Sequence, residues 1–163
     1  MIDIRHVYQT FGDRHILKDV SLSIKEGETM VILGASGSGK STLLKLIIGL
    51  LRPTSGKVLV NGKDMGQLSE EELNEERRSM GMVFQYSALF DSLNVKENVA
   101  FGLRMHTRLS EEEIDAIVKE KLHLVGLDGI EDLMPANLSG GMKKRVSLAR
   151  ARIPARAKAP TFA

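Results

Sequence analysis

Apolar and polar residues alternate in two short runs near the start of the chain, Ile2–Ile4 and Val20–Ile24. This alternation predicts strands with one buried face. Two other runs, 29–33 and 80–84, are almost continuously apolar and predict strands that are buried on both faces. A further predicted strand, Lys57–Val60, precedes an Asn-Gly pair, which is a strong signal for a hairpin turn.

Helical patterns follow or interrupt these strands. The spacing predicts a helix from Lys40 to about Leu50, and capping boxes at Ser69 and Ser110 predict two more helix starts. The helix after Ser110 is amphipathic and should end near Gly126, and another is expected from Asn94 to Met105. The mostly helical stretch from residue 91 to about 151 therefore predicts a distinct subdomain.

A glycine-rich segment joins the apolar run 29–33 to the first helix. It reads GASGSGKST over Gly34–Thr42, which has the form G-x-x-x-x-G-K-[ST] of a phosphate-binding loop. Its glycines let backbone N–H groups approach an anion, and the helix directs its positive end to the same place. Lys40 can reach terminal phosphates, and the Ser41 hydroxyl can bind a magnesium ion. The simpler alternative is a Gly/Ser-rich turn between a strand and a helix.

Composition narrows the class of protein without naming a ligand. With 163 residues, 42% of them hydrophobic, the chain is long enough for one globular domain with a core. The sequence has no cysteine, no signal-peptide core and no apolar run of transmembrane length, so we expect an intracellular protein. The net charge of +2 gives no indication of a nucleic-acid partner. An acidic segment at residues 70–76 and a basic one after Asp132 are most simply solvated helix faces.

A second candidate anion site lies near the end of the chain, at Leu138-Ser139-Gly140-Gly141-Met142. Ser139 is a good N-cap for the helix-prone segment 143–151, and the glycines free the backbone to approach a ligand. The alternative is an ordinary helix cap.

The order and spacing of these motifs are specific. A phosphate loop, then Phe84-Gln85, then LSGGM followed by KKRVSLARA resembles the ATP-binding subunit of an ABC transporter, over residues 1 to about 151. The resemblance implies an α/β P-loop NTPase fold with a RecA-like core, an antiparallel β subdomain and an inserted helical subdomain. It implies a division into 1–90 (nucleotide-binding core with the β subdomain), 91–151 (helical subdomain with the signature motif) and 152–163 (an atypical tail).

The resemblance also implies site residues and cofactors. Phe11 would stack on the adenine of ATP; its alternative is an ordinary aromatic at a strand end. Lys40 and Gln85 would act in catalysis, and Ser41 and Gln85 would hold Mg²⁺. A head-to-tail homodimer would place the signature of one subunit against ATP held by the other. The expected nucleotide-binding residues are Phe11, Gly34, Ala35, Ser36, Gly37, Ser38, Gly39, Lys40, Ser41, Thr42, Ser139, Gly140, Gly141 and Met142.

Details of the sequence narrow the resemblance further. Met142 stands where most of the family has Gln, and flanking strings such as Ser87–Phe90 and Leu133–Pro135 resemble the ATPases of Mla-type, MCE-linked lipid transporters. That resemblance implies a phospholipid or related lipid as cargo, an integral membrane permease as partner, and an MCE-type lipid-binding protein in the same complex. It also implies a place on the cytoplasmic face of the inner membrane. Transport of another solute is the alternative.

The match stops after Ala151, where the family continues with a strand ending in Asp-Glu and, later, a switch histidine. Residues 152–163 read RIPARAKAPTFA and contain no Asp, Glu or His. We therefore expect a fold that is incomplete at the C-terminus, has an open sheet edge beside Val31 and Leu33, is marginally stable, and hydrolyses ATP too slowly to be useful.

Three other functions are alternatives to the transporter subunit. A nucleotide-binding fragment without hydrolysis differs from it only beyond Ala151. An ABC-type ATPase acting on DNA or ribosomes would be expected to carry coiled-coil heptads or a duplicated phosphate loop, and the sequence has neither. A small-molecule kinase would keep the phosphate loop but would not explain LSGGM.

Overall fold

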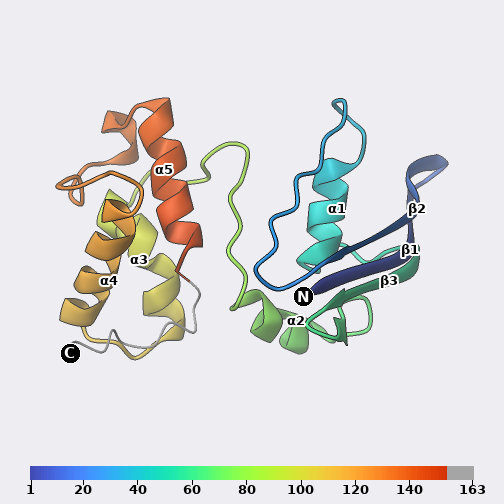
Figure 1. Ribbon diagram of the computed structural model, residues 1–163. Coiled ribbons are helices and arrows are strands. Elements are labelled where there is room, and N and C mark those ends of the chain that lie inside the picture. Colours follow the sequence, from blue (N-terminus) through green and yellow to red (C-terminus); the bar gives the residue numbers. More distant parts are fainter. Residues whose placement is uncertain (154–163) are drawn as a thin grey trace. The chain divides into compact units, whose positions relative to one another are not determined.

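The computed structural model describes residues 1–153, which form two compact units, Met1–Arg77 and a second one that begins at Arg78 (Figure 1). Each unit has its own secondary structure and is described by itself below. The predicted division at residues 90 and 151 stays a prediction. Most of the predicted atypical tail, residues 154–163, lies outside the described residues.

The first unit is built on an antiparallel sheet. Its strands are β1 (Ile2–Phe11), β2 (Arg14–Ile24), β3 (Ser55–Val60) and β4 (Lys63–Asp64), in the order β2-β1-β3-β4. Every neighbouring pair runs antiparallel. The predicted antiparallel β subdomain is thereby confirmed, and the two alternating runs are parts of β1 and β2.

The predicted hairpin turn joins β3 to β4. Asn61 and Gly62 both have positive φ, 50° and 83°, which is the backbone of a two-residue hairpin turn. The Asn61 side chain also accepts a hydrogen bond at 2.8 Å from the N-terminal ammonium group of Met1. The turn is therefore fixed to the residue that directly precedes the neighbouring strand β1.

The two continuously apolar runs do not form strands, so those predictions are wrong for this structure. Residues 29–33 and 80–84 have no regular secondary structure. Val31 and Leu33 are 73% and 88% exposed, although their side chains are those of a buried strand. A strand needs a neighbour to pair its N–H and C=O groups, and the described residues offer these runs none.

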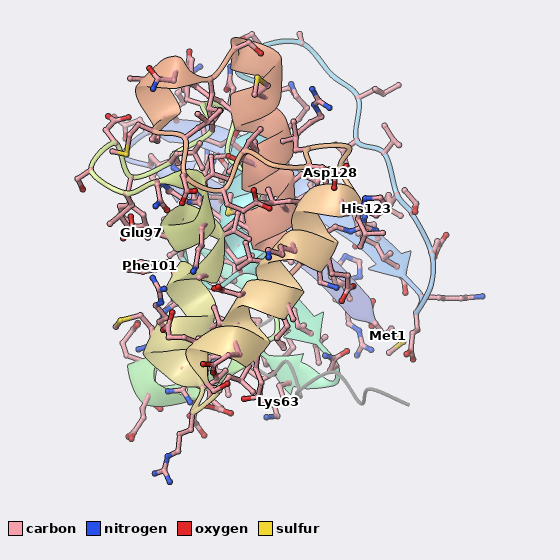
Figure 2. All side chains as sticks on the ribbon, turned by 90° about the vertical axis from the view of Figure 1, so that its left-hand side faces the viewer. Met1, Lys63, Glu97, Phe101, His123 and Asp128 are labelled. Atoms are coloured by element: carbon pink, nitrogen blue, oxygen red, sulfur yellow. The ribbon has the colours of Figure 1, made fainter. Side chains whose placement is uncertain are left out.

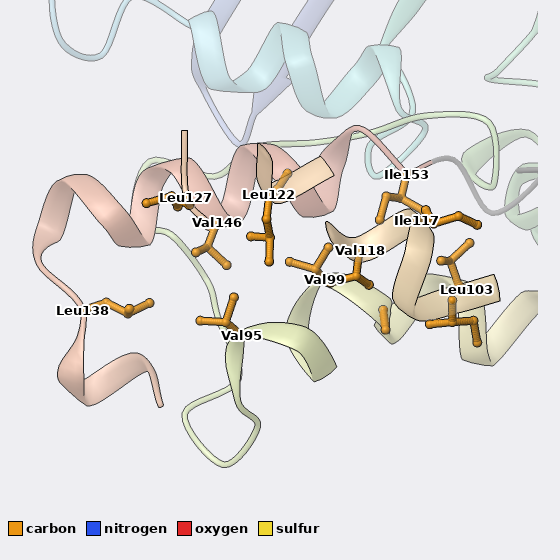
Figure 3. Close-up of a cluster of buried hydrophobic side chains, with 13 residues drawn as sticks. Val95, Val99, Leu103, Ile117, Val118, Leu122, Leu127, Leu138, Val146 and Ile153 are labelled. Carbon is orange, nitrogen blue, oxygen red and sulfur yellow. The ribbon is translucent and has the colours of Figure 1, made fainter. Parts of the chain in front are cut away.

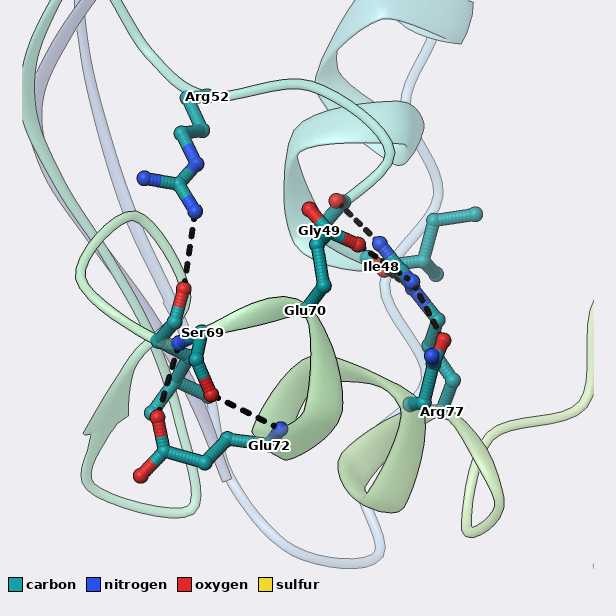
Figure 4. A network of polar contacts seen from close by, with 9 residues as sticks. Ile48, Gly49, Arg52, Ser69, Glu70, Glu72 and Arg77 are labelled. Carbon is teal, nitrogen blue, oxygen red and sulfur yellow. Dashed lines mark hydrogen bonds and ion pairs between the residues drawn. The ribbon is translucent and has the colours of Figure 1, made fainter.

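Two helices complete the first unit: α1 (Lys40–Ile47) and α2 (Glu70–Arg77). The predicted capping box is present, because Glu72 N–H donates to Ser69 Oγ (3.3 Å) and Ser69 N–H donates to the Glu72 carboxylate (2.8 Å). Figure 4 shows this cap at the start of α2 and, at the other end of the helix, the Arg77 guanidinium, which donates to the carbonyls of Ile48 (3.1 Å) and Gly49 (2.6 Å). Arg77 therefore joins α2 to the end of the phosphate-loop helix.

The second unit is helical, as predicted. It contains α3 (Val95–His106), α4 (Glu111–His123), a 3₁₀ turn η1 (Pro135–Asn137) and α5 (Gly140–Ala151). Full capping boxes start α3 at Asn94 and α4 at Ser110. Figure 2 shows Glu97 and Phe101 following one another along one side of α3, and the ring of Phe101 lies 4.7 Å from that of Phe90.

The three helices share one apolar core (Figure 3). Its members come from all three helices and from the segments that precede and follow α5. They recur at helical spacing, which is why the sequence pattern predicted the helices. The buried core residues of this cluster are Val95, Val99, Ala100, Leu103, Ile114, Ile117, Val118, Leu122, Leu127, Leu138, Val146, Ala149 and Ile153.

Candidate functional site

The glycine-rich loop ends at the start of α1. Gly39 is the N-cap, with φ at 94°, and no side chain caps the helix. The first intrahelical bond runs from Leu43 N–H to Gly39 C=O at 2.9 Å. The N–H groups of the first turn and the positive end of the helix dipole therefore point toward the loop, which is the arrangement that binds phosphate.

Lys40 folds back over this loop. Its ammonium nitrogen donates to the carbonyl oxygens of Gly34 and Ala35, both at 2.8 Å, and lies 3.5 Å from Ser38 Oγ. A flexible ammonium with three donors can exchange carbonyl acceptors for phosphate oxygens. The loop thus carries its positive charge at the centre of the backbone that would surround an anion.

Gly39 also fixes the loop against the sheet. A Cβ atom placed there would lie 2.7 Å from the Leu17 side chain and 3.3 Å from the Ile16 carbonyl oxygen. Both neighbours belong to β2, so the loop packs directly on that strand. The remaining predicted loop residues, Ser36, Gly37, Ser41 and Thr42, are exposed or half-buried, and Ser41 presents its hydroxyl to solvent.

Phe11 is the last residue of β1 and pairs with Arg14 across the β1–β2 turn. It is 48% exposed, so its ring is available to a planar ligand. It shares its hairpin with Ile16 and Leu17, on which Gly39 packs. The stacking role stays a prediction.

The signature residues start α5. Ser139 is the N-cap, and its Oγ accepts a hydrogen bond from Met142 N–H at 3.2 Å. Gly140 and Gly141 are exposed, and a Cβ atom on either would meet nothing within 4 Å. A ligand can therefore approach this backbone closely. The fourth residue differs, because the Met142 side chain is half-buried and packs against the core of the second unit.

Gln85 is exposed and follows the run 80–84. The segment after it is bound to α5. Arg150 donates to the carbonyls of Ala88 (2.8 Å) and Ser87 (3.3 Å), and Ser147 Oγ donates to the same Ser87 carbonyl. Burial lowers the pKa of Arg150, although the guanidinium remains charged.

Sequence reasoning missed three residues that bind the segment after Gln85: Asn98, Ser147 and Arg150. Asn98 and Ser147 are fully buried, and their signal was a polar residue at a core position of an amphipathic helix. Arg150 gave no such signal, because arginine is common near the end of a helix.

Each unit therefore carries part of the predicted site. Phe11 and Gly34–Thr42 lie in the first unit, whereas Gln85 and Ser139–Met142 lie in the second. Residues 1–153 contain no group of three or more His, Cys, Asp or Glu side chains that could hold a metal ion. The magnesium-binding roles of Ser41 and Gln85 stay predictions.

Comparison with known proteins identifies the family. Residues 17–156 match the sequence profile of the family described as ABC transporter. The chain belongs to this family.

Solved structures agree with the assignment. The chain is similar to the ATP-binding cassette MJ0796, whose dimeric structure is 39% identical in sequence, with a TM-score of 0.86 over 93% of this chain and 68% of that one. CbiO1 from Clostridium perfringens, part of the ABC transporter complex cbiONQ, is 35% identical with a TM-score of 0.82, over 92% of this chain and 60% of that one. The predicted ABC-type P-loop fold is thereby confirmed.

Curated relatives include ATP-binding proteins named for two kinds of transport. Protein TRIGALACTOSYLDIACYLGLYCEROL 3 of Arabidopsis thaliana is 50% identical over 94% of this chain and 44% of its own length. The intermembrane phospholipid transport system ATP-binding protein MlaF of Haemophilus influenzae is 48% identical over 93% of this chain and 57% of its own. A probable ribonucleotide transport ATP-binding protein, mkl of Mycobacterium leprae, is 49% identical over 93% and 44%.

The chain spans about half the length of these curated relatives. None of the helices within residues 1–153 is long and apolar enough to cross a membrane.

Proposed function

We propose that this chain binds ATP with Mg²⁺ as the nucleotide-binding part of an ABC transporter, and that it couples ATP binding and hydrolysis to transport. One observation carries the proposal: the Lys40 ammonium sits among the carbonyls of Gly34 and Ala35, directly before an uncapped helix start. A triphosphate that replaced these carbonyls would receive the lysine charge, backbone N–H donors and the helix dipole together.

The neighbouring residues complete this half of the site. Ser41, one position into α1, offers a hydroxyl to a magnesium ion, which would neutralise phosphate charge when bound. The half-exposed ring of Phe11 offers a stacking surface for the base. Gln85 would help to bind the magnesium ion and to hold the attacking water.

The signature supplies the other half, from a second subunit. Ser139, Gly140 and Gly141 form a second exposed helix start on the same chain. A monomer has no use for two separate triphosphate sites. A head-to-tail homodimer uses both, because each signature completes the phosphate loop of the partner subunit. The dimeric structure of the similar cassette MJ0796 supports the formation of a dimer.

Phospholipid or a related lipid is the proposed cargo, supported by the names of MlaF and of the Arabidopsis relative. The chain would act on the cytoplasmic face of the inner membrane, bound to an integral membrane permease, with an MCE-type lipid-binding protein in the same complex. The mkl relative, named for ribonucleotide transport, favours a different solute as the second candidate. Lipid flux measured in vesicles that contain the reconstituted complex would separate the two.

Nucleotide binding without turnover is a second candidate activity. It is favoured by the exposure of Val31 and Leu33, because the apolar run before the phosphate loop has no sheet partner in the described structure. A core that lacks its central pairing holds the loop less rigidly than phosphoryl transfer requires. Phosphate release, measured beside nucleotide binding on the same sample, distinguishes binding from hydrolysis.

The direct test is titration with a fluorescent ATP analogue in the presence of Mg²⁺. Lys40→Ala removes the loop cation and should weaken binding at least tenfold, because a charge-assisted phosphate contact is worth roughly 1.5–3 kcal/mol. Lys45→Ala is the matched control, since Lys45 is an exposed lysine in the last turn of the same helix. Equal affinities in the two variants would refute the proposal.

A further inference from the structure

The Gln85 segment and the signature helix are joined by hydrogen bonds within the second unit. Arg150 spans two successive carbonyls, Ala88 at 2.8 Å and Ser87 at 3.3 Å, and Ser147 binds the Ser87 carbonyl from one turn earlier. Serine at position 147 is fully buried and arginine at 150 is half-buried, so the contacts with the Ser87 carbonyl are partly shielded from water, whereas the contact with Ala88 is exposed.

The other end of the segment is fixed by α3. The Asn98 side chain accepts a hydrogen bond from Phe90 N–H at 2.8 Å and donates to the carbonyls of Phe90 (3.0 Å) and Leu93 (2.8 Å). Asn98 is fully buried. Residues 87–93 are therefore held between two helices, and Gln85 lies two residues before the first fixed carbonyl.

α5 carries the signature at its other end. Ser139 caps the first turn of the helix, and Arg150 lies in its last turn. An α-helix transmits a displacement along its axis because its backbone bonds form a continuous ladder. The helix α5 therefore connects Ser139 to the Ser87 and Ala88 carbonyls, which follow Gln85 in the sequence.

We infer that Arg150, with Ser147, is a positioning residue that makes the Gln85 segment and the signature helix move together. The inference rests on the proposed function, in which Gln85 contacts one nucleotide and the signature contacts the other. A change at Gln85 in one subunit would then reach the signature of that same subunit, and through it the second ATP. The two sites of a dimer would be linked within each chain.

Arg145 provides the contrast. It lies on the same helix and also donates to two carbonyls, Val125 at 3.2 Å and Gly126 at 3.0 Å, but these follow α4. Arg145→Ala and Arg150→Ala therefore remove the same kind of side chain and the same kind of contact from one helix. They differ in the segment that loses its contact with α5: residues 87–88 in Arg150→Ala and residues 125–126 in Arg145→Ala.

The test is amide hydrogen exchange on the wild-type chain and on three variants, Arg150→Ala, Arg150→Lys and Arg145→Ala. Phe90 and Leu93 are the reporter amides, since their N–H groups are bonded to Asn98 Oδ1 and to the Phe90 carbonyl. Arg150→Ala should speed their exchange about tenfold or more, as expected for loss of hydrogen bonds from a charged group. Arg150→Lys should fall between, and Arg145→Ala should instead speed exchange at residues 124–127.

A second measurement tests whether the Gln85 segment and the signature respond to ATP together. Mg-ATP should slow exchange at residues 86–93 and at 140–143 together in the wild type. In Arg150→Ala the two segments should respond separately, with the affinity for ATP at the phosphate loop changed less than twofold. A purely structural role would raise exchange throughout the helical unit and leave the response to ATP concerted.

The inference is overturned if Arg150→Ala leaves the Phe90 and Leu93 amides unchanged, if it speeds exchange evenly across the unit, or if ATP still protects both segments together in that variant. Failure of the proposed function is a different result, in which Mg-ATP does not bind the wild type. The comparison of Arg150→Ala with Arg145→Ala in the absence of nucleotide would still decide whether the link exists.

Discussion

The side chains of His6 and Asp19 meet across strands β1 and β2, with Nδ1 of the histidine 2.7 Å from Oδ1 of the aspartate. Both residues have left-handed backbone, with φ at 48° and 51°. The strand register explains their positions. Ile4 pairs with Leu22 but Val7 with Val20, so β1 carries one extra residue there.

The register then returns. Gln9 pairs with Leu17, so the stretch of β2 that contains Asp19 carries the next extra residue. Two opposed bulges thus bring Leu17 back beside Gln9, and Leu17 is the residue on which Gly39 packs. The bulges therefore help to set where the phosphate loop rests on the sheet.

The loss of stability on substitution of Asp19 should depend on its left-handed backbone more than on its contact with His6. Both side chains are largely exposed, at 79% and 54%, so the pair itself contributes little. Asp19→Gly keeps the left-handed backbone without strain and should leave the free energy of unfolding within about 0.5 kcal/mol. Asp19→Val places a β-branched residue there and should cost about 1–2 kcal/mol. Urea unfolding measures both, and equal losses would contradict the bulge argument.

Alanine substitutions at Gly39 and Gly37 should have unequal effects. Both positions have positive φ, 94° and 80°, so both substitutions strain the backbone by about 1 kcal/mol. A Cβ atom at Gly39 also meets Leu17 and the Ile16 carbonyl, whereas one at Gly37 meets nothing within 4 Å. Gly39→Ala should therefore lose roughly tenfold more ATP-analogue affinity than Gly37→Ala. Fluorescence titration decides this, and a larger loss at Gly37 would overturn the packing argument.

The buried amide of Asn98 should be costly to remove. It satisfies the Phe90 N–H and the carbonyls of Phe90, Leu93 and Asn94 at 2.8–3.0 Å. Asn98→Ala removes the partner of the Phe90 N–H and of the Leu93 carbonyl, whereas the Phe90 and Asn94 carbonyls keep their backbone bonds from Leu93 N–H and Asn98 N–H. The variant should lower the free energy of unfolding by about 2–4 kcal/mol. Thermal unfolding of the variant beside Lys119→Ala, a helical substitution outside the core cluster, tests the expectation. A loss below about 1 kcal/mol would show that water reaches this segment.

The capping box at Ser69 should make a pH-dependent contribution to the free energy of unfolding. The Ser69 backbone and hydroxyl groups, by hydrogen bonding, lower the pKa of Glu72 below its ordinary value. A carboxylate with a lowered folded pKa stabilises the fold above its unfolded pKa, and this stability is lost as the pH falls through the folded pKa. Glu72→Gln should therefore reduce stability at pH 7 and have a smaller effect at about pH 3. Urea unfolding of both proteins at the two pH values measures the difference, and a larger effect in acid would contradict the sign.

The sequence predicted helices and caps well because both are local. Ser69 and Ser110, whose capping boxes were predicted, carry their partners three residues away, so no knowledge of the fold was needed. The phosphate loop was equally readable, because its lysine and glycines lie within seven residues. The hairpin at Asn61 was found for the same reason.

The apolar runs 29–33 and 80–84 were misread because a strand depends on a partner distant in sequence. Continuous apolar runs are typical of strands that are paired within a sheet and buried there. The described residues supply no strand that pairs with either run. The link from Arg150 to Ser87 and Ala88 crosses more than sixty residues, and no local pattern predicts such a contact. The sequence therefore predicted which residues belong to the candidate site, but not the hydrogen bonds that connect its segments.

Met142 allows the last prediction, because its side chain is turned into the core while its neighbours Gly140 and Gly141 face solvent. Met142→Gln places an amide where a thioether packs and should lower the free energy of unfolding by about 1 kcal/mol or more, since a buried amide loses its hydrogen bonds to water. Met142→Leu keeps the volume and should cost less. If Met142 binds nucleotide through its side chain, both variants should instead change ATP-driven dimerisation equally. Chemical unfolding and analytical ultracentrifugation with Mg-ATP, on the wild type and both variants, separate a packing role from a binding role.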